Sequence, residues 1–372
     1  MTKIFEDRID NFRKKLKQNN IEAFLILNGE NREYLSGYSA EDTGFEESAG
    51  ALIISADHLI VATDSRFELQ AVGEAPLYEV RCYKSSITET IADFLKETGC
   101  KKLGFESSRI TYSQYCKIKE DINSENIQAE FNPADKLVNN LRVIKSEFEI
   151  NKIRKTLDIA EKAYLSMISE LEPGQTEKAT AWNLEKKMRE LGADGLSFPP
   201  IVASGPNSAL PHAISGNRRI KKNEPLLFDW GAKLNSYCSD TSRTVVIGKP
   251  DDKFTEVYNI LFHAQQMAIE AIMPGVSTKQ IDSIARDHIE KNGYGKKFGH
   301  GLGHGVGLEI HEPPRVSPLR DIPLEAGMII TIEPGIYLPD WGGIRLENMV
   351  LVTHDGASVL NSLSYDDYII GN

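Results

Sequence analysis

The C-terminal half of the chain contains an internal repeat, and this repeat restricts the possible folds more than any other feature of the sequence. Pro-Gly turns begin the two copies at Glu172 to Thr176 and at Met273 to Ser277, 101 residues apart. Each turn opens a helical segment, and these segments stop near Gly192 and Gly293, again 101 residues apart. Strand-like stretches follow in both copies. We therefore predict a pseudo-twofold α/β domain whose site lies where the copies meet.

Two carboxylates interrupt the strand-like stretches of each copy. Asp229 ends an apolar run, and Asp240 lies on the returning arm after the turn residues Lys233 to Ser236. We expect these arms to form a hairpin whose two aspartates share one cation. Glu333 follows Asp229 by 104 residues, and Glu347 follows Asp240 by 107. Because an unpaired ionised carboxylate on a buried strand is costly, the four indicate bound metal ions.

Histidines in the same region add further candidate groups. His304 lies in a glycine-rich loop whose alternating glycines would let the backbone approach an ion closely, and we assign it to the metal. Four carboxylates and one imidazole suit two divalent ions such as Mn²⁺, Co²⁺, Fe²⁺ or Zn²⁺. His212 and His311 are not needed as ligands, and we expect them beside the metals as hydrogen-bond donors. His300 shares the glycine-rich loop, but we assign it no chemistry.

The order Asp, Asp, His, Glu, Glu closely resembles the pita-bread metallopeptidases, the family of aminopeptidase P, prolidase, methionine aminopeptidase and creatinase. The resemblance covers roughly residues 150 to 365 and implies two divalent metals, with Mn²⁺ as the first candidate. The implied ligands are Asp229, Asp240, His304, Glu333 and Glu347. Six motifs carry the resemblance: Leu210-Pro-His212, Asp229-Trp-Gly-Ala, Cys238-Ser-Asp240-Thr-Ser-Arg-Thr, Gly303-His304-Gly-Val-Gly-Leu-Glu-Ile-His311-Glu-Pro-Pro, Ile332-Glu333-Pro-Gly and Gly343-Ile-Arg345-Leu-Glu347-Asn.

Leu-Pro-His, together with His-Glu-Pro after the ligand histidine, is typical of the proline-peptidase branch of this family. The resemblance implies catalytic roles for His212, His311, Glu333 and Arg345. Glu333 would take up the proton of the attacking water, and the two histidines would stabilise the developing oxyanion or protonate the leaving nitrogen. Arg345 would orient a ligand carboxylate by hydrogen bonding to it without binding the metal, with Asp240 as its expected partner.

The sequence departs from the family pattern on the first predicted hairpin. Asn235-Ser236 precede Tyr237 where the family often has Asp-Gly, and Thr241-Ser242 stand where Met-Thr is frequent. We expect neither departure to touch a ligand.

Three classes of function remain open. The preferred reading is a dinuclear-metal exopeptidase that cleaves between an N-terminal residue and proline, an Xaa-Pro aminopeptidase, with an Xaa-Pro dipeptidase as its alternative. The second is a metal-independent C–N hydrolase of the creatinase kind, with His212 as its acid and base. The third is a non-catalytic pita-bread protein that binds peptides. The intact set of five ligands argues against the second and third classes.

The N-terminal part of the chain reads as a separate α/β domain. Segments at Asn31 to Tyr38 and at Thr63 to Phe67 resemble the N-terminal domain of creatinase and the proline peptidases. We place the domain boundary near residue 140, giving a creatinase-like domain at 1–140 and a pita-bread domain at 141–372. Ser146 is a plausible N-cap for the helix that begins the second domain. For the first domain we predict a helix near 4–19 and strands at 23–27, 51–55 and 59–63.

Composition limits the remaining possibilities. The 372 residues, 41% of them hydrophobic, suffice for two domains with sizeable cores. No run of 18 apolar residues occurs and the N-terminus is charged, so we expect a cytoplasmic protein that does not enter a membrane. A net charge of -11 disfavours nucleic-acid binding. We expect a peptide with proline at its second position as substrate, and a homodimer by resemblance to family members of this size. The four cysteines lack metal-knuckle spacing and are expected to be reduced: Cys82, Cys100, Cys116 and Cys238.

Overall fold

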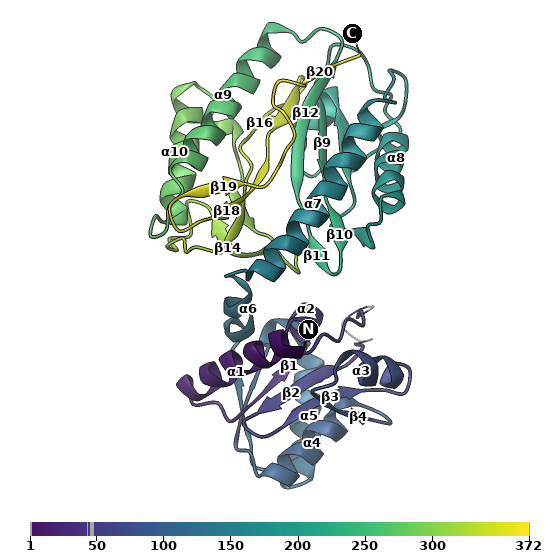
Figure 1. The fold of residues 1–372 in the computed structure, drawn as a ribbon, viewed down its shortest axis with the longest axis vertical. Coiled ribbons are helices and arrows are strands. Elements are labelled where there is room, and N and C mark those ends of the chain that lie inside the picture. The colour runs from purple at the N-terminus through teal and green to yellow at the C-terminus, as the bar shows by residue number, and fades with distance from the viewer. Residues whose placement is uncertain (1, 43, 45–47, 372) are drawn as a thin grey trace. The chain divides into compact units, whose positions relative to one another are not determined.

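The computed structural model describes every residue except 1, 43, 45–47 and 372. The chain divides into two compact units, Met1–Arg142 and Val143–Asn372, and each unit combines helices with β-sheet (Figure 1). Within the described residues, every helix is too short or too polar to cross a bilayer.

The first unit is built on a six-stranded mixed sheet with the order β4-β3-β2-β1-β5-β6. The central strands β1, β2 and β3 pair antiparallel, whereas β4, β5 and β6 run parallel to their neighbours. The predicted strands are confirmed. The six strands are β1 (Ala23–Ile26), β2 (Ala51–Ser55), β3 (Leu59–Thr63), β4 (Glu79–Cys82), β5 (Lys102–Phe105) and β6 (Glu130–Pro133).

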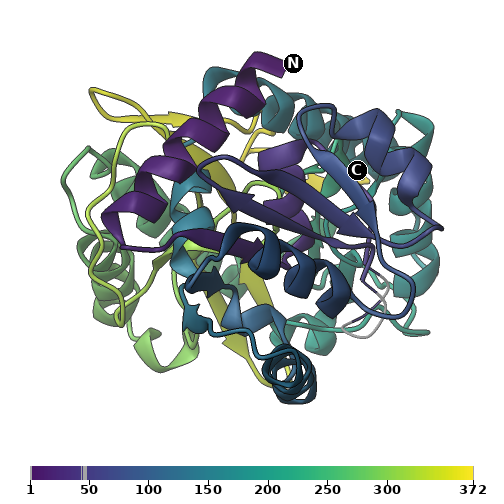
Figure 2. The same cartoon turned by 90° about the horizontal axis from the view of Figure 1, so that it is seen from below.

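Helices cover both faces of this sheet (Figure 2). Successive side chains of β1 point to opposite faces, as the pleat of a strand requires. Phe24 contacts Phe12 of α1, with ring centroids 5.4 Å apart, whereas Leu25 packs in a core cluster with Phe94 of α4 and Ile118 of α5. The predicted first helix is confirmed. The helices of this unit are α1 (Thr2–Gln18), α2 (Gly29–Ser36), α3 (Glu68–Glu74), α4 (Ile87–Thr98), α5 (Tyr112–Ser124), α6 (Lys136–Arg142) and the short 3-10 helix η1 (Ser107–Arg109).

The second unit places two helix pairs around small sheets (Figure 1). Its helices are α7 (Glu147–Ile168), α8 (Glu177–Glu190), α9 (Asp252–Glu270) and α10 (Thr278–Lys291), with the 3-10 helices η2 (Gly205–Ala209) and η3 (Gly295–Lys297). Ser146 forms a capping box with Glu149 at the start of α7, as predicted. Tyr164 of α7 stacks on Trp230 of β9 with centroids 4.4 Å apart, in a core that joins this helix pair to the first hairpin.

The strands of the second unit form four sheets. Their orders are β11-β10-β7, β20-β12-β9-β8, β14-β13-β15-β18-β19 and β16-β17. The strands of the first copy are β7 (Gly195–Leu196), β8 (Ile201–Ser204), β9 (Leu226–Trp230), β10 (Ala232–Leu234), β11 (Tyr237–Cys238) and β12 (Thr241–Ile247). Those that follow are β13 (Gly303–Gly305), β14 (Glu312–Val316), β15 (Ile329–Ile332), β16 (Gly335–Leu338), β17 (Gly342–Arg345), β18 (Asn348–Val352), β19 (Ala357–Val359) and β20 (Ile369–Ile370).

The internal repeat corresponds to a repeated structure. In the first copy the Gly174 amide donates to the Ile220 carbonyl, and in the second the Gly275 amide donates to the Leu324 carbonyl, both at 2.8 Å. Each glycine has a positive φ and stands just before the N-cap of the second helix of its pair. The pseudo-twofold α/β fold predicted from the spacing is therefore confirmed.

Candidate metal centre

Asp229 and Asp240 lie on the two arms of the first hairpin. Strand β9 pairs antiparallel with β12, and this register places Asp229 opposite Ser242. The turn between β10 and β11 is formed by Asn235 and Ser236, with φ angles of 47° and 69°. Positive φ at both central residues is typical of the type I′ turn found in tight hairpins. The predicted hairpin is therefore confirmed.

Asp229 forms a buried ion pair with Arg345. The Arg345 Nη2 atom lies 2.6 Å from Asp229 Oδ2, and the side chains are 3% and 14% exposed. The expectation that Arg345 would pair with Asp240 is therefore wrong. The strand register explains the difference, because Arg345 Nε donates to Ser242 Oγ at 2.9 Å and Ser242 lies directly opposite Asp229. Asp229 Oδ1 is buried and has no hydrogen-bond partner among the residues that the structure describes.

His304 lies on β13 between carboxylates from both copies. Its Nδ1 atom is 3.0 Å from the Gly305 carbonyl oxygen, which can only accept, so Nδ1 donates to the backbone and Nε2 is the nitrogen that faces the carboxylates. Nε2 lies 3.5 Å from Asp240 Oδ2 and 3.3 Å from Glu333 Oε1. The imidazole is thus oriented as a metal-ligating histidine commonly is, with the second nitrogen fixed by a backbone carbonyl.

The predicted ligands converge on one buried region. Asp240, His304 and Glu347 each offer a ligand atom, and these atoms lie within 4.8 Å of one another. Glu333 reaches the group through its contact with His304. Ser242 Oγ donates to Glu347 Oε2 at 2.8 Å, so the expectation that this position does not touch a ligand is wrong.

Burial and mutual repulsion shift the acidities of these carboxylates. Burial raises the pKa of Asp240 and of Glu347 well above the usual range, and neighbouring carboxylates raise both further. Burial also raises the pKa of Asp229, against the opposing charge of Arg345. For Glu333, burial acts to raise the pKa, but the hydrogen bond and charge of His304 outweigh it and lower the pKa to about 2.

This donor set fits divalent metal ions. Two buried carboxylates, Asp240 and Glu347, and two partly buried ones, Asp229 and Glu333, lie in one region with His304. Arg345 offsets their charge only in part, and one oxygen of Asp229 has no partner among the described residues. Hard and borderline divalent ions prefer such oxygen and nitrogen donors. A bound cation would replace the repulsion between the carboxylates by coordination.

The two remaining predicted histidines lie beside this region and are exposed. The ring centroid of His311 lies 4.4 Å from that of His304, with the ring planes at 71°. Desolvation of the ring and then the neighbouring His304 lower the pKa of His311. The Pro211 carbonyl accepts from Arg345 Nη1 at 3.2 Å, which ties the segment carrying His212 to the arginine that binds Asp229.

The glycines around His304 have a packing role that the sequence did not reveal. A Cβ atom on Gly303 would lie 1.9 Å from the Thr331 carbonyl oxygen, and one on Gly305 would lie 2.3 Å from the Pro313 carbonyl oxygen. Strand β13 lies between β14 and β15, and these glycines let the three backbones approach one another. The close backbone approach that these glycines permit is therefore between β13 and its neighbouring strands.

Tyr337 and His300 extend the network behind Arg345. Arg345 Nη1 donates to the Tyr337 hydroxyl at 2.8 Å, and His300 Nε2 lies 3.0 Å from the same oxygen. Sequence reasoning assigned no chemistry to His300 and did not identify Tyr337. The strand pattern contains a signal for Tyr337. Gly335 pairs with Arg345 in the β16–β17 hairpin, and because side chains alternate along a strand, Tyr337 lies on the same face as Arg345.

Comparison with known proteins agrees with this architecture. Residues 151–354 match the model of metallopeptidase family M24, and residues 8–144 match the creatinase/prolidase N-terminal domain. The chain is 39% identical over 355 residues to the Xaa-Pro dipeptidase of Pyrococcus furiosus, covering 95% of this chain and 97% of that enzyme.

Two solved structures are similar over nearly their whole length. The Xaa-Pro dipeptidase from Bacillus anthracis superposes with a TM-score of 0.92 and 37% identity, covering 98% of this chain and all of that one. The X-Pro aminopeptidase from Thermotoga maritima gives a TM-score of 0.85 and 35% identity, covering 96% of this chain and all of that one. The motifs, the pseudo-twofold fold and these matches agree, and the chain belongs to metallopeptidase family M24, with a creatinase/prolidase N-terminal domain.

Proposed function

We propose that this metallopeptidase is an Xaa-Pro dipeptidase that hydrolyses the bond between the first residue of a dipeptide and proline. The observation that carries the proposal is the convergence of Asp240, His304 and Glu347 on one buried region, with Glu333 in contact with His304 and Asp229 paired with Arg345. The similarity of nearly the whole chain to Xaa-Pro dipeptidases supports proline as the second residue of the substrate. The sequence alone favoured the aminopeptidase, and the relatives shift the preference to the dipeptidase.

In this proposal Asp229, Asp240, His304, Glu333 and Glu347 hold two divalent ions. Mn²⁺ is the first candidate, and Co²⁺, Zn²⁺ and Fe²⁺ are alternatives that the same donors accept. Ions bound there would lower the pKa of water towards neutrality and polarise the scissile carbonyl.

Glu333 is proposed to accept the proton of the attacking water. Its Oε1 atom already accepts a hydrogen bond from Thr331 Oγ1 at 3.1 Å and lies 3.3 Å from His304 Nε2, so the carboxylate is held in place. The water oxygen forms a bond to the carbonyl carbon as its proton passes to Glu333. Thr331 and His304 therefore orient the carboxylate on which this transfer depends.

His212 and His311 are proposed to act on the substrate. Both are exposed, so a peptide can reach them, and either ring can donate a hydrogen bond to the carbonyl oxygen as negative charge develops on it. The imide nitrogen of an Xaa-Pro bond has no hydrogen. It must gain a proton as the C–N bond breaks, and one of these histidines would deliver it to release free proline.

Arg345 and Ser242 are proposed to position ligands without touching substrate. Arg345 binds Asp229 Oδ2, and its Nε donates to Ser242 Oγ, which in turn donates to Glu347 Oε2. One arginine and one serine thus fix a carboxylate from each copy of the repeat. Such hydrogen-bonded neighbours are a common way to set the geometry of metal ligands.

An Xaa-Pro aminopeptidase is the second candidate. The similarity to the Thermotoga maritima enzyme favours it, and the same site chemistry would serve it. The two candidates differ in whether the substrate may continue beyond proline.

Peptide length separates the two candidates in one experiment. Metal-stripped protein is assayed on Ala-Pro, Ala-Pro-Ala and Ala-Ala-Ala before and after Mn²⁺ is added. Metal-dependent cleavage of Ala-Pro alone is the expected result, and cleavage of Ala-Pro-Ala would instead establish the aminopeptidase. Cleavage of neither proline peptide would refute both candidates.

The homodimer expected from the sequence remains a separate proposal. Sedimentation equilibrium distinguishes the 41.5 kDa chain from a species of twice that mass. A species at the mass of one chain would contradict the dimer.

A further inference from the structure

Gln265, on α9, is a buried polar side chain that joins the two glutamate-bearing segments of the second copy. The residue is 0% exposed. Its Nε2 atom donates to the Ile332 carbonyl at 2.7 Å and to the Leu346 carbonyl at 3.0 Å. Ile332 immediately precedes Glu333, and Leu346 immediately precedes Glu347. A carboxamide has two N–H donors, so each of them holds the backbone before one proposed ligand.

A tyrosine fixes the orientation of this carboxamide. The Tyr365 hydroxyl donates to Gln265 Oε1 at 2.6 Å and accepts from Asn348 Nδ2 at 2.5 Å. The reverse orientation of the amide would turn its oxygen towards two carbonyl oxygens and its NH₂ group towards the tyrosine. The observed orientation is therefore the one in which all three hydrogen bonds form. Asn348, the residue after Glu347, joins the same network through its bond to the Tyr365 hydroxyl.

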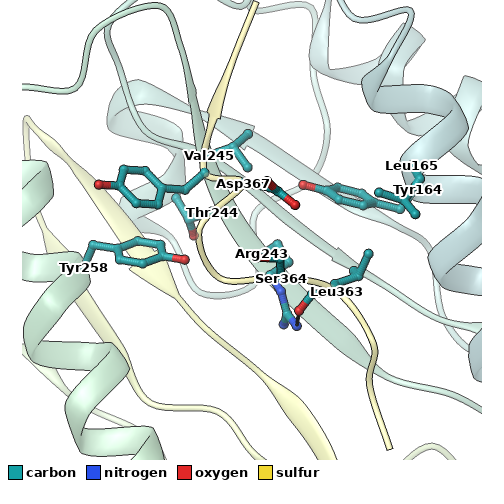
Figure 3. Close-up of a pocket in the computed structure, with 10 residues that line it drawn as sticks. Tyr164, Leu165, Arg243, Thr244, Val245, Tyr258, Leu363, Ser364 and Asp367 are labelled. Atoms are coloured by element: carbon teal, nitrogen blue, oxygen red, sulfur yellow. Dashed lines mark hydrogen bonds between the residues drawn. The ribbon is translucent and has the colours of Figure 1, made fainter.

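Arg243 of β12 also binds the segment that carries Glu347. Its guanidinium donates to the Glu347 carbonyl at 2.5 Å, to Asn348 Oδ1 at 2.9 Å and to the Leu363 carbonyl at 3.3 Å. The guanidinium also lies over the Tyr365 ring, 5.1 Å from its centroid. Arg243 also lines a pocket together with Tyr164 of α7, Tyr258 of α9 and residues of the C-terminal segment (Figure 3).

The first copy of the repeat offers a comparison at the equivalent helix position. Glu161 on α7 precedes Gln265 by 104 residues, the offset that also separates Asp229 from Glu333. Glu161 is 4% exposed, and its carboxylate accepts from the Ser362 amide, which is shared between both oxygens, and from the Ser362 hydroxyl. Glu161 therefore holds the C-terminal segment, whereas Gln265 holds the segments that carry ligands.

We propose that Gln265 is a positioning residue that sets the spacing of Glu333 and Glu347 before metal binds. The inference deepens the proposed function and rests on it, because it requires both glutamates to be ligands. A donor set that is already ordered loses less conformational freedom when the ion binds. Metal affinity should therefore depend on the carboxamide, although the carboxamide does not touch the metal.

The test compares metal binding by two buried-residue variants. Gln265→Met keeps the length of the side chain and removes three hydrogen bonds. Glu161→Met is the matched control, because it also removes a hydrogen-bonded polar group from an equivalent buried helix position. Each apo protein is titrated with Co²⁺ against a competing chelator, and the visible absorption of bound Co²⁺ reports ligand geometry.

We expect Gln265→Met to weaken metal binding by about 10- to 100-fold and to alter the Co²⁺ spectrum, as loss of groups that orient ligands commonly does. Glu161→Met should lower the melting temperature of the apo protein and leave metal affinity unchanged. If Gln265→Met does not fold, Tyr365→Phe provides the same test with a milder change. It removes the hydroxyl that fixes the carboxamide, and it should weaken metal binding in the same direction.

Three results would overturn the inference. Wild-type affinity in Gln265→Met, or in Tyr365→Phe where the first variant does not fold, would remove the proposed role and leave the proposed function intact. Equal losses of affinity in Gln265→Met and Glu161→Met would show that general destabilisation is the cause. A wild-type protein that binds no divalent metal would refute the proposed function itself, and the inference with it.

Discussion

At the scale of single residues, the candidate site depends on contacts that sequence motifs do not contain. The motifs identified Asp229, Asp240 and Arg345, but the arginine was assigned to the wrong aspartate. Its partner is set by the register of β9 with β12, which puts Ser242 opposite Asp229. Ser242 was dismissed because a motif records residue types along the chain, whereas its contact with Glu347 crosses 105 residues of sequence.

Ser242 provides the first prediction. Ser242→Ala removes the hydroxyl that donates to Glu347 Oε2 and accepts from Arg345 Nε. We expect metal affinity to fall by about 10-fold or more, because the carboxylate loses the group that orients it. Ser242→Thr, which keeps the hydroxyl, is the control and should bind metal as the wild type does. Equal losses in both variants would contradict the proposed role of the hydroxyl.

His212 provides the second prediction. His212→Ala should leave the metal content unchanged and lower kcat on Ala-Pro by roughly 100-fold, because an oxyanion donor is lost. Steady-state kinetics and metal analysis of the same sample measure the two effects. A wild-type kcat would return His212 to a structural role.

At the scale of elements, the strand register brings the candidate ligands together. The hydrophobic pattern and the turn residues correctly predicted the β9–β12 hairpin, the cap of α7 and three strands of the first unit. The sequence did not predict the close packing of β13 against its neighbours, because glycine spacing alone does not show which backbone lies beside a glycine. The pairing of β13 with β14 and with β15 decides which backbone lies beside each glycine.

Gly303 provides a prediction at this scale. Gly303→Ala would place a Cβ atom 1.9 Å from the Thr331 carbonyl oxygen, so β13 and β15 must separate. We expect the free energy of unfolding to fall by about 3 kcal/mol or more, as steric overpacking against backbone does. Gly299→Ala is the control, because a Cβ there meets no atom within 4 Å. Urea denaturation measures both variants, and equal stabilities would contradict the packing role.

At the scale of the whole molecule, the second unit is a repeated α/β structure in which each copy contributes carboxylates to one buried region. The repeat spacing predicted this arrangement, because offsets of 104 and 107 residues matched Asp229 with Glu333 and Asp240 with Glu347, two carboxylates in each copy. Substrate length could not be predicted in the same way. The sequence favoured an aminopeptidase, but a solved Xaa-Pro dipeptidase and a solved X-Pro aminopeptidase are both similar to nearly the whole chain.

Metal removal provides a prediction for the whole molecule. The apo protein keeps several carboxylates in one buried region, where their repulsion opposes folding. Metal bound only to the folded state should stabilise it by about 2.7 kcal/mol when free metal is 100 times its dissociation constant. Differential scanning calorimetry should therefore show a higher melting temperature with Mn²⁺ than after chelation. An identical melting temperature would contradict metal binding at this site.

The measurement that tests the central claim most directly is hydrolysis of Ala-Pro as a function of metal bound per chain. Stripped protein receives Mn²⁺ in steps, and activity and bound metal are measured on each sample, with Glu347→Ala in parallel. We predict no cleavage without metal, full activity as the site fills towards two ions per chain, and neither activity nor the full metal content in Glu347→Ala. Cleavage by metal-free protein, or full activity in Glu347→Ala, would contradict the assignment of this carboxylate group as the catalytic metal centre.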